Sequence, residues 1–172
     1  IGKALSFDGT GDYVRIPDNS AFNYSTNDFT IEGWGYRTAG GGFFLYAYNP
    51  GQSPYFVLFS YANGNIQMWD SGFKDSGVNP GNSQWFHLAY VRQSGTVKFF
   101  INGVQASNTY SVTTNYTNTA GIYIGVSQSS EYTNGKIDDV RIYNYARTAE
   151  QVMQDYNAGL SMRMGSQTAG EM

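Results

Sequence analysis

Residues 85–106 read WFHLAYVRQSGTVKFFINGVQA, and this stretch decides the fold. Trp85–Arg92 alternates apolar with other side chains at a period of two, which is the pattern of a β-strand. Val97–Ile101 and Val104–Ala106 lie on either side of Asn102-Gly103, a pair of residues that suits the left-handed backbone of a tight turn. The stretch therefore predicts antiparallel strands joined by a two-residue hairpin turn.

Strand patterns of the same kind recur along most of the chain. They cover Ala4–Phe7, Tyr13–Ile16, Phe29–Tyr36, Phe43–Tyr48, Tyr55–Tyr61, Ile66–Trp69, Ile122–Val126 and Ile137–Tyr143. Asn63-Gly64, between two of these runs, predicts a second hairpin. About ten strands without intervening helices indicate a sandwich or jelly roll rather than alternating strands and helices.

The composition supports an all-β domain and excludes several classes of function. Aromatic residues make up 17% of the chain and charged residues 13%, and the 21 glycines suit tight turns between strands. The net charge is −3 and the ten lysines and arginines are scattered, so the basic stripe of a nucleic-acid binder is missing. Cysteine is absent, which excludes disulfides and thiolate metal sites. No apolar run is long enough to span a membrane.

One helix is expected near the C-terminus. Thr148–Gln151 has the capping-box pattern, Val152 and Tyr156 follow on an apolar side, and the helix is expected to end near Gly159. Leu160–Met172 has no periodicity and is expected to be a tail, or an arm that becomes ordered on a partner. The predicted organisation is one domain over residues 1–159 and a tail over 160–172.

Three stretches together resemble the laminin-G-like domains of the concanavalin A-like jelly-roll family, which are relatives of the pentraxins and legume lectins. They are Ala4–Val14 with Phe29–Trp34, Trp85–Val104, and Gly135–Glu150. The resemblance implies two antiparallel sheets of about six or seven strands each, with the first and last strands side by side. It also implies binding of glycans or proteins at a cell or particle surface. Phe43–Pro80 matches no family pattern.

A calcium ion is the metal that this pattern favours. The loop Asp8–Asp12 reads Asp-Gly-Thr-Gly-Asp and offers carboxylate and carbonyl oxygens, which are the ligands calcium prefers. The resemblance implies that Asp138, beside the first strand, completes the site, although Asp138 and Asp139 would face opposite ways in a regular strand. The predicted ligands are Asp8, Asp12, Asp138 and Asp139, around an ion that clamps the terminal strands together. The alternative is that Asp8 and Asp12 cap a turn, while Asp139 pairs with Arg141 or Lys136.

Catalysis is not expected. Glycosidases of this fold need two carboxylates that flank the scissile bond. Glu32 has no acidic neighbour two residues away, and its neighbour at four residues, Asp28, precedes the strand. His87, the sole histidine, lies within a predicted strand and is expected to be a structural residue.

Aromatic side chains are the candidates for ligand binding, because a ring face covers the apolar C–H face of a sugar. Those of the unmatched middle segment are Tyr46, Tyr48, Tyr55, Tyr61 and Trp69. Polar neighbours that could bind hydroxyl groups are Asn49, Gln52, Asn65 and Gln67. The alternative is that these aromatic rings fill the core or cover a flat sheet face.

The sequence therefore predicts a non-catalytic recognition module, exposed outside the cell or on a surface. It would bind a glycan or a surface protein and hold a structural calcium ion. The alternative is a structural component of a virion or surface appendage, such as a decoration protein or receptor-binding knob, with the C-terminal tail making assembly contacts.

Overall fold

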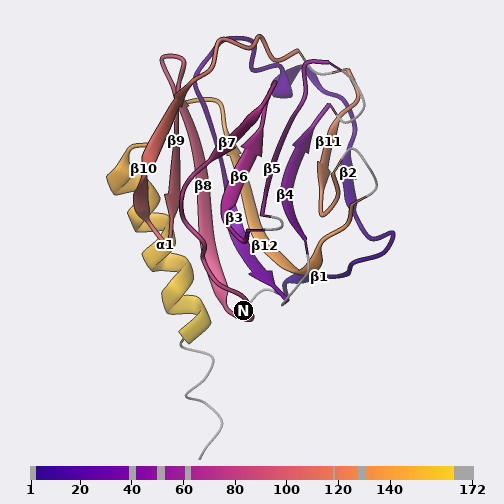
Figure 1. The fold of residues 1–172 in the computed structure, drawn as a ribbon, viewed down its shortest axis with the longest axis vertical. Helices are drawn as coiled ribbons and strands as arrows, with labels where there is room; N and C mark the ends of the chain where they lie inside the picture. The colour runs from indigo at the N-terminus through magenta and orange to yellow at the C-terminus, as the bar shows by residue number, and fades with distance from the viewer. Residues whose placement is uncertain are drawn as a thin grey trace, which may run out of the picture.

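A computed structural model describes residues 3–38, 42–49, 53–60, 63–117, 119–127 and 131–164 (Figure 1). Within these ranges the chain forms two six-stranded sheets in which every paired strand is antiparallel. The first sheet has the strand order β1 (Leu5–Asp8), β12 (Asn134–Tyr143), β3 (Phe29–Arg37), β8 (Trp85–Gln93), β9 (Thr96–Ile101), β10 (Val104–Ser111). The second has the order β2 (Val14–Ile16), β11 (Ile122–Ile124), β4 (Phe43–Tyr48), β5 (Phe56–Ser60), β6 (Ile66–Trp69), β7 (Phe73–Asp75). A 3₁₀ turn, η1 (Ser20–Phe22), and one α-helix, α1 (Ala149–Met164), complete the fold.

The predicted jelly-roll sandwich is confirmed, and so are its main pairings. β1 pairs with β12, with Leu5 opposite Ile137 and Asp8 opposite Asn134, so the first and last strands lie side by side. The hairpin turn at Asn102-Gly103 has φ values of 52° and 78°, the left-handed backbone that the sequence predicts. β7 is a strand that the sequence pattern did not indicate, because it is short and surrounded by Ser, Gly and Asn.

The core lies between the two sheets and is unusually aromatic. Phe56 of the second sheet stacks on two neighbouring rings of the first sheet, Phe29 at 5.9 Å and Tyr90 at 5.8 Å between ring centroids. All three rings are fully buried. Burial of the apolar surface of such rings is the main favourable contribution to the free energy of folding.

Helix α1 packs on the outer face of the first sheet. Val152 of α1 is fully buried against Ala89, Val91 and Phe100 of that sheet. The ring of Tyr156 stacks on Trp34 of β3, with ring centroids 5.6 Å apart. In Figure 1 the helix runs along the β8–β10 side of the domain. Both faces of the first sheet are therefore engaged, one by the core and one, in part, by the helix.

The capping box predicted at the start of this helix is confirmed. The Thr148 backbone N–H donates to Gln151 Oε1 at 3.0 Å, and the Gln151 N–H donates to Thr148 Oγ1 at 3.3 Å. The predicted end near Gly159 is wrong, because the helix continues to Met164. Gly159 has a packing role instead: a Cβ atom there would lie 2.4 Å from Trp34 Nε1.

We expect Gly159→Val to destabilise the protein by forcing α1 away from Trp34. Overpacking of this kind costs about 1–3 kcal/mol. Ala158→Val is the matched control, because Ala158 is the exposed neighbour and acquires the same β-branched side chain. Urea denaturation should show a lower free energy of unfolding for Gly159→Val than for Ala158→Val. Equal losses in the two variants would contradict the packing of Gly159 on Trp34.

Candidate functional site

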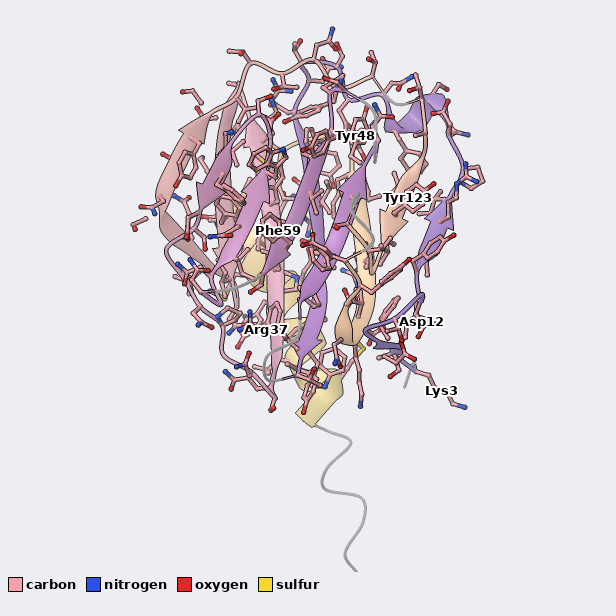
Figure 2. The ribbon with its side chains drawn as sticks, turned by 45° about the vertical axis from the view of Figure 1, so that its right-hand side comes forward. Lys3, Asp12, Arg37, Tyr48, Phe59 and Tyr123 are labelled. Carbon is pink, nitrogen blue, oxygen red and sulfur yellow. The ribbon has the colours of Figure 1, made fainter. Side chains whose placement is uncertain are left out.

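The outer face of the second sheet carries a layer of apolar and aromatic side chains. Along β5, Phe56 and Leu58 point into the core, and Val57 and Phe59 point outward. Along β6, Met68 points into the core and its neighbours lie on the outer face. Figure 2 shows this sheet in front, with Phe59 and Tyr123 on its face and helix α1 behind. This face is the one that α1 does not cover.

Strand register aligns one row of these outward side chains across all six strands. The row consists of Arg15, Tyr123, Ala47, Val57, Trp69 and Phe73. Six strands at about 4.8 Å spacing make this row about 24 Å long. One end carries the aromatic Trp69 and Phe73, the other carries Tyr123 followed by Arg15, and the middle is formed by small aliphatic side chains.

Exposure divides the face into a buried floor and accessible edges. Phe44, Ala47, Val57 and Phe59 are buried on the outer face, and Tyr55, Trp69 and Tyr123 pack against them while remaining partly exposed. Phe73 at one end of the row is 68% exposed, the largest value among the exposed large hydrophobic side chains described. Apolar and aromatic side chains that form a contiguous group at the surface are typical of a binding surface.

The edge at β6 and β7 combines aromatic rings with a cluster of amide groups. Trp69 and Phe73 lie edge to face with ring centroids 4.6 Å apart. In the neighbouring cross-strand pair, about 7 Å along the strands, Gln67 faces Asp75 and donates to its carboxylate at 2.9 Å. We call Asn65, Gln67, Trp69, Phe73 and Asp75 the β6–β7 patch.

Asp75 is the charged group of the patch. Its carboxylate accepts hydrogen bonds from Asn63 Nδ2 at 3.1 Å, Asn65 Nδ2 at 2.9 Å and the Gly77 backbone N–H at 2.7 Å, in addition to Gln67. Partial burial raises the pKa of Asp75, but these hydrogen bonds outweigh it and hold the pKa below its ordinary value. The patch therefore presents a stable carboxylate at neutral pH, surrounded by amide donors.

A buried arginine anchors the turn that supplies two of these donors. Arg37 crosses from β3 of the first sheet and donates to the backbone carbonyl of Gly64 at 3.1 Å and to Asn79 Oδ1 at 3.3 Å. It also hydrogen-bonds to Ser60, the last residue of β5. On the other side, the Tyr110 hydroxyl of β10 donates to the Asp75 carbonyl at 2.7 Å. The polar half of the patch is thus held in place from the first sheet.

The structure separates the predicted ligand-binding residues. Trp69 lies in the β6–β7 patch with its polar neighbours Asn65 and Gln67, and Tyr55 is half-buried beside the apolar floor. Tyr46 and Tyr48 are fully buried and stack on Phe56 in the core, so they present no surface to a ligand. Asn49 is also buried, at 1% exposure. Tyr61 and Gln52 lie outside the described residues.

Phe73 and Asp75 were missed by the sequence reasoning, which placed no strand between Trp69 and Trp85. Their spacing of two residues is the signal that could have found them, because it places an aromatic ring and a carboxylate on one face of a strand. With only three residues in β7, that signal is too short to stand out.

The four predicted calcium ligands do not converge. Asp8 lies opposite Asn134, so it is four residues, or about 13 Å, along β12 from the level of Asp138. Asp8 Oδ1 accepts from the backbone N–H of Thr10 at 2.8 Å, and Asp12 Oδ2 accepts from the Asp8 N–H at 3.3 Å. These contacts form a capped turn.

Asp139 is engaged elsewhere. It has a φ of 53° at a bulge of β12 and forms a two-pronged ion pair with Arg141, at 2.8 and 3.1 Å. Throughout the described ranges, no three His, Asp or Glu side chains gather closely enough to hold a metal ion. The residues present therefore do not fit a calcium ion that clamps the terminal strands, and such an ion stays a prediction from the resemblance.

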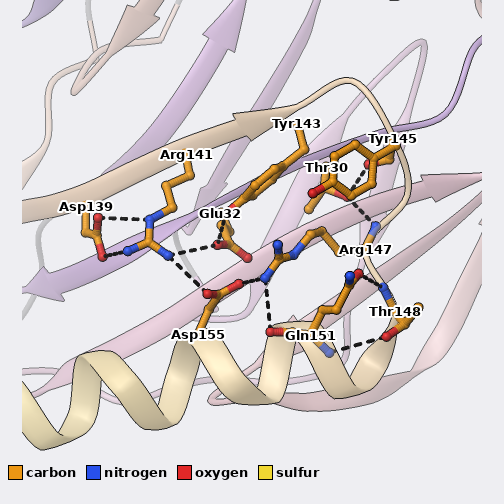
Figure 3. A network of polar contacts seen from close by, with 10 residues as sticks. All are labelled: Thr30, Glu32, Asp139, Arg141, Tyr143, Tyr145, Arg147, Thr148, Gln151 and Asp155. Atoms are coloured by element: carbon orange, nitrogen blue, oxygen red, sulfur yellow. Dashed lines mark hydrogen bonds and ion pairs between the residues drawn. The ribbon is translucent and has the colours of Figure 1, made fainter.

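Glu32 lies in a polar network beneath α1 (Figure 3). Its side chain is 1% exposed; Oε1 accepts from the Tyr143 hydroxyl at 3.2 Å and lies 3.8 Å from Arg141 Nη1. Asp155 of α1 pairs with Arg141 at 3.1 Å and also forms an ion pair with Arg147. His87 is buried beside Trp34 and Tyr156, as expected of a structural residue. Glu32 thus helps to fasten the helix and faces no open surface.

Burial raises the pKa of Glu32, although the charge of Arg147 and the hydroxyl of Tyr143 act in the opposite direction. A carboxyl group whose pKa is higher in the folded state binds more protons there, so its contribution to stability falls as pH rises above the ordinary value of 4.5. We expect the stability of the unmodified protein relative to Glu32→Gln to fall between pH 4.5 and 7.

Glu150→Gln is the control for this measurement. The pKa of Glu150, at the exposed start of α1, is lowered by hydrogen bonds from its own backbone N–H and from Thr148. The contribution of Glu150 to the stability of the folded protein therefore depends on pH in the opposite way: it is present above pH 4.5 and is lost as pH falls. Urea denaturation across the pH range measures both. A pH-independent difference for Glu32→Gln would contradict the burial of its charge.

The two sheets, their strand order and the aromatic outer face define a jelly-roll β-sandwich domain. The chain belongs to the concanavalin A-like lectin/glucanase superfamily, whose family model matches residues 8–153. A search of curated protein sequences gave no significant match. No helix in the described part of the chain is long and apolar enough to cross a membrane.

Several solved structures share this fold. Domain 4 of AbnA, a GH43 extracellular arabinanase from Geobacillus stearothermophilus solved with arabinotriose, is 24% identical with a TM-score of 0.70, and the alignment covers 90% of this chain and 76% of that one. The CBM40 domain of Ruminococcus gnavus IT-sialidase, bound to α2,3-sialyllactose, is 14% identical with a TM-score of 0.71, covering 90% and 97%.

A putative carbohydrate binding protein from Bacteroides ovatus is 15% identical with a TM-score of 0.72. The alignment covers 88% of this chain but only 46% of that protein. At these identities the likeness shows the shared fold alone.

Proposed function

We propose that this chain is a non-catalytic module that binds a neutral glycan through the β6–β7 patch. The observation that carries the proposal is the pairing of the exposed Phe73 ring and Trp69 with the amide-bound carboxylate of Asp75, about 7 Å away on the same face. The rings suit the C–H face of a pyranose or furanose, and the polar groups are within reach of its hydroxyls.

The charge of Asp75 favours a neutral sugar. Protein donors already occupy the carboxylate oxygens of Asp75, so the carboxylate acts mainly through its charge, which repels a ligand that carries a negative charge. The family membership and the oligosaccharides bound in two structures of the same fold support glycan recognition.

The absence of catalysis is part of the proposal. The patch contains a single carboxylate, and hydrogen bonds lower the pKa of Asp75, whereas a glycosidase needs two carboxyl groups and an acid with a raised pKa. Glu32 has a raised pKa but lies beneath α1. We therefore expect binding without release of reducing sugar.

The proposed function implies a location for the protein. A glycan-binding module of this kind works where glycans are, outside the cell or on its surface. The sequence left two alternatives to glycan binding. One is a protein ligand on the same face, and the other is assembly into a virion or appendage through Leu160–Met172.

A glycan array of neutral oligosaccharides, arabinotriose among them, followed by calorimetry on the best ligand, tests the proposal. Phe73→Ala removes an exposed ring, so the fold should survive. Loss of ring stacking costs about 1–1.5 kcal/mol, so we expect about tenfold weaker binding. Asp75→Asn, which keeps the size of the side chain, should weaken binding as well.

Tyr145→Ala is the matched control, because Tyr145 is 45% exposed and contacts Tyr143 of the first sheet. It should leave affinity unchanged. If Phe73→Ala and Tyr145→Ala bind equally well, the patch is not the site. A blank array with a folded, multimeric protein would favour the assembly alternative.

A further inference from the structure

The opposite edge of the same sheet face has a second aromatic group with a positive charge. Tyr123 of β11 stacks on Tyr13 with ring centroids 5.7 Å apart and an interplanar angle of 29°. Arg15 of β2, directly opposite Tyr123 in the register, lies over the Tyr123 ring with its guanidinium carbon 5.8 Å from the ring centroid. Tyr13 is 50% exposed and Arg15 is exposed. We call Tyr13, Arg15 and Tyr123 the β2–β11 corner.

Arg15 differs from the other arginines whose side chains the structure describes. Arg37 and Arg92 are buried and donate to carbonyl and amide oxygens of the protein, and Arg141 and Arg147 form ion pairs beneath α1. Within the described ranges the side chain of Arg15 has neither an ion pair nor a hydrogen bond. Its N–H groups are therefore open to a ligand.

Asp12 and Asp18, each three residues from Arg15 in sequence, form no ion pair with it. Asp12 turns back into its own loop, where it accepts from the Asp8 backbone N–H. The whole chain has a net charge of −3, so it offers anions no general attraction. An anionic ligand at this face would have to be recognised locally, within the Debye length of about 8 Å.

The geometry of the corner defines the chemistry of that ligand. A guanidinium held over a ring keeps its N–H edge free, and that planar fork matches the two oxygens of a carboxylate. The half-exposed ring of Tyr13 beside it offers a surface for the C–H face of a sugar. We propose that the β2–β11 corner is a second subsite, which binds a sugar bearing a carboxylate, such as a uronic or sialic acid.

The two edges of the face thus differ in charge. The β6–β7 patch presents the carboxylate of Asp75, and the β2–β11 corner presents the guanidinium of Arg15. The aligned row from Arg15 to Phe73 separates the two edges by about 24 Å. The two proposals rest on different residues, so each can fail without the other.

Calorimetry with two matched pairs of probes tests the subsite: sialyllactose against lactose, and trigalacturonate against neutral galactotriose. Within a pair the main difference is the carboxylate, and the two pairs separate sialic from uronic acids. We expect at least one carboxylated probe to bind tighter than its neutral partner, and to bind more weakly as salt rises from about 0.05 to 0.5 M.

Arg15→Gln should reduce affinity for that probe about tenfold or more and remove the preference over its neutral partner. Arg15→Lys keeps the charge without the planar fork and should restore only part of the affinity. Lys136→Gln is the matched control, since Lys136 is an exposed cation 5.6 Å from the Tyr36 ring centroid on the first sheet, and the substitution removes the same charge.

Phe73→Ala should leave binding of the carboxylated probe unchanged, which separates this subsite from the β6–β7 patch. The proposal is overturned if neither carboxylated probe binds, if each neutral partner binds equally well, or if Arg15→Gln and Lys136→Gln have the same effect.

Discussion

The docking of α1 on the first sheet is the constraint on which the rest of the structure depends. A sheet has two faces, and the inner faces of both sheets are used by the aromatic core. Trp34, Tyr156 and the ion pairs of Asp155 hold the helix against the outer face of the first sheet. On the outer face of the second sheet, the accessible aromatic and polar side chains lie at the two edges, and these edges are left for recognition.

Strand pairing turns the sequence of the second sheet into a surface with defined positions. Antiparallel register places Trp69 beside Phe73 and Gln67 beside Asp75, although β6 and β7 have only four and three residues. Arg37 and Tyr110 reach this edge from the first sheet and fix its turn and its backbone. The donors around Asp75 are therefore organised before a ligand arrives, which lowers the entropic cost of binding.

The fold was predictable from period and turn chemistry, and the site only in part. Two-residue alternation and the Asn-Gly turns are local signals, and the structure confirms the strands and hairpins that they predict. Which face of a strand is inner depends on packing between sheets: Tyr46 and Tyr48 have the same local signature as Trp69, but they stack in the core. A resemblance to a family does not give the distances between side chains. Here the register of β1 on β12 keeps Asp8 away from Asp138. In the sequence, Gly159 suggests the end of a helix. The close contact with Trp34 that accounts for this glycine depends on packing and cannot be read from neighbouring residues.

The three tryptophans provide the most direct test of the central claim that the second sheet binds the ligand. Trp34 lies beneath α1, Trp85 lies on β8 of the first sheet, and Trp69 lies in the β6–β7 patch. Their indole N–H groups give separate signals in a ¹⁵N-correlated NMR spectrum, which can be assigned by substitution. Titration with the best neutral oligosaccharide should shift the Trp69 signal and leave those of Trp34 and Trp85 in place. A shift of Trp34 or Trp85 with Trp69 unchanged would place recognition on the first sheet and contradict the account.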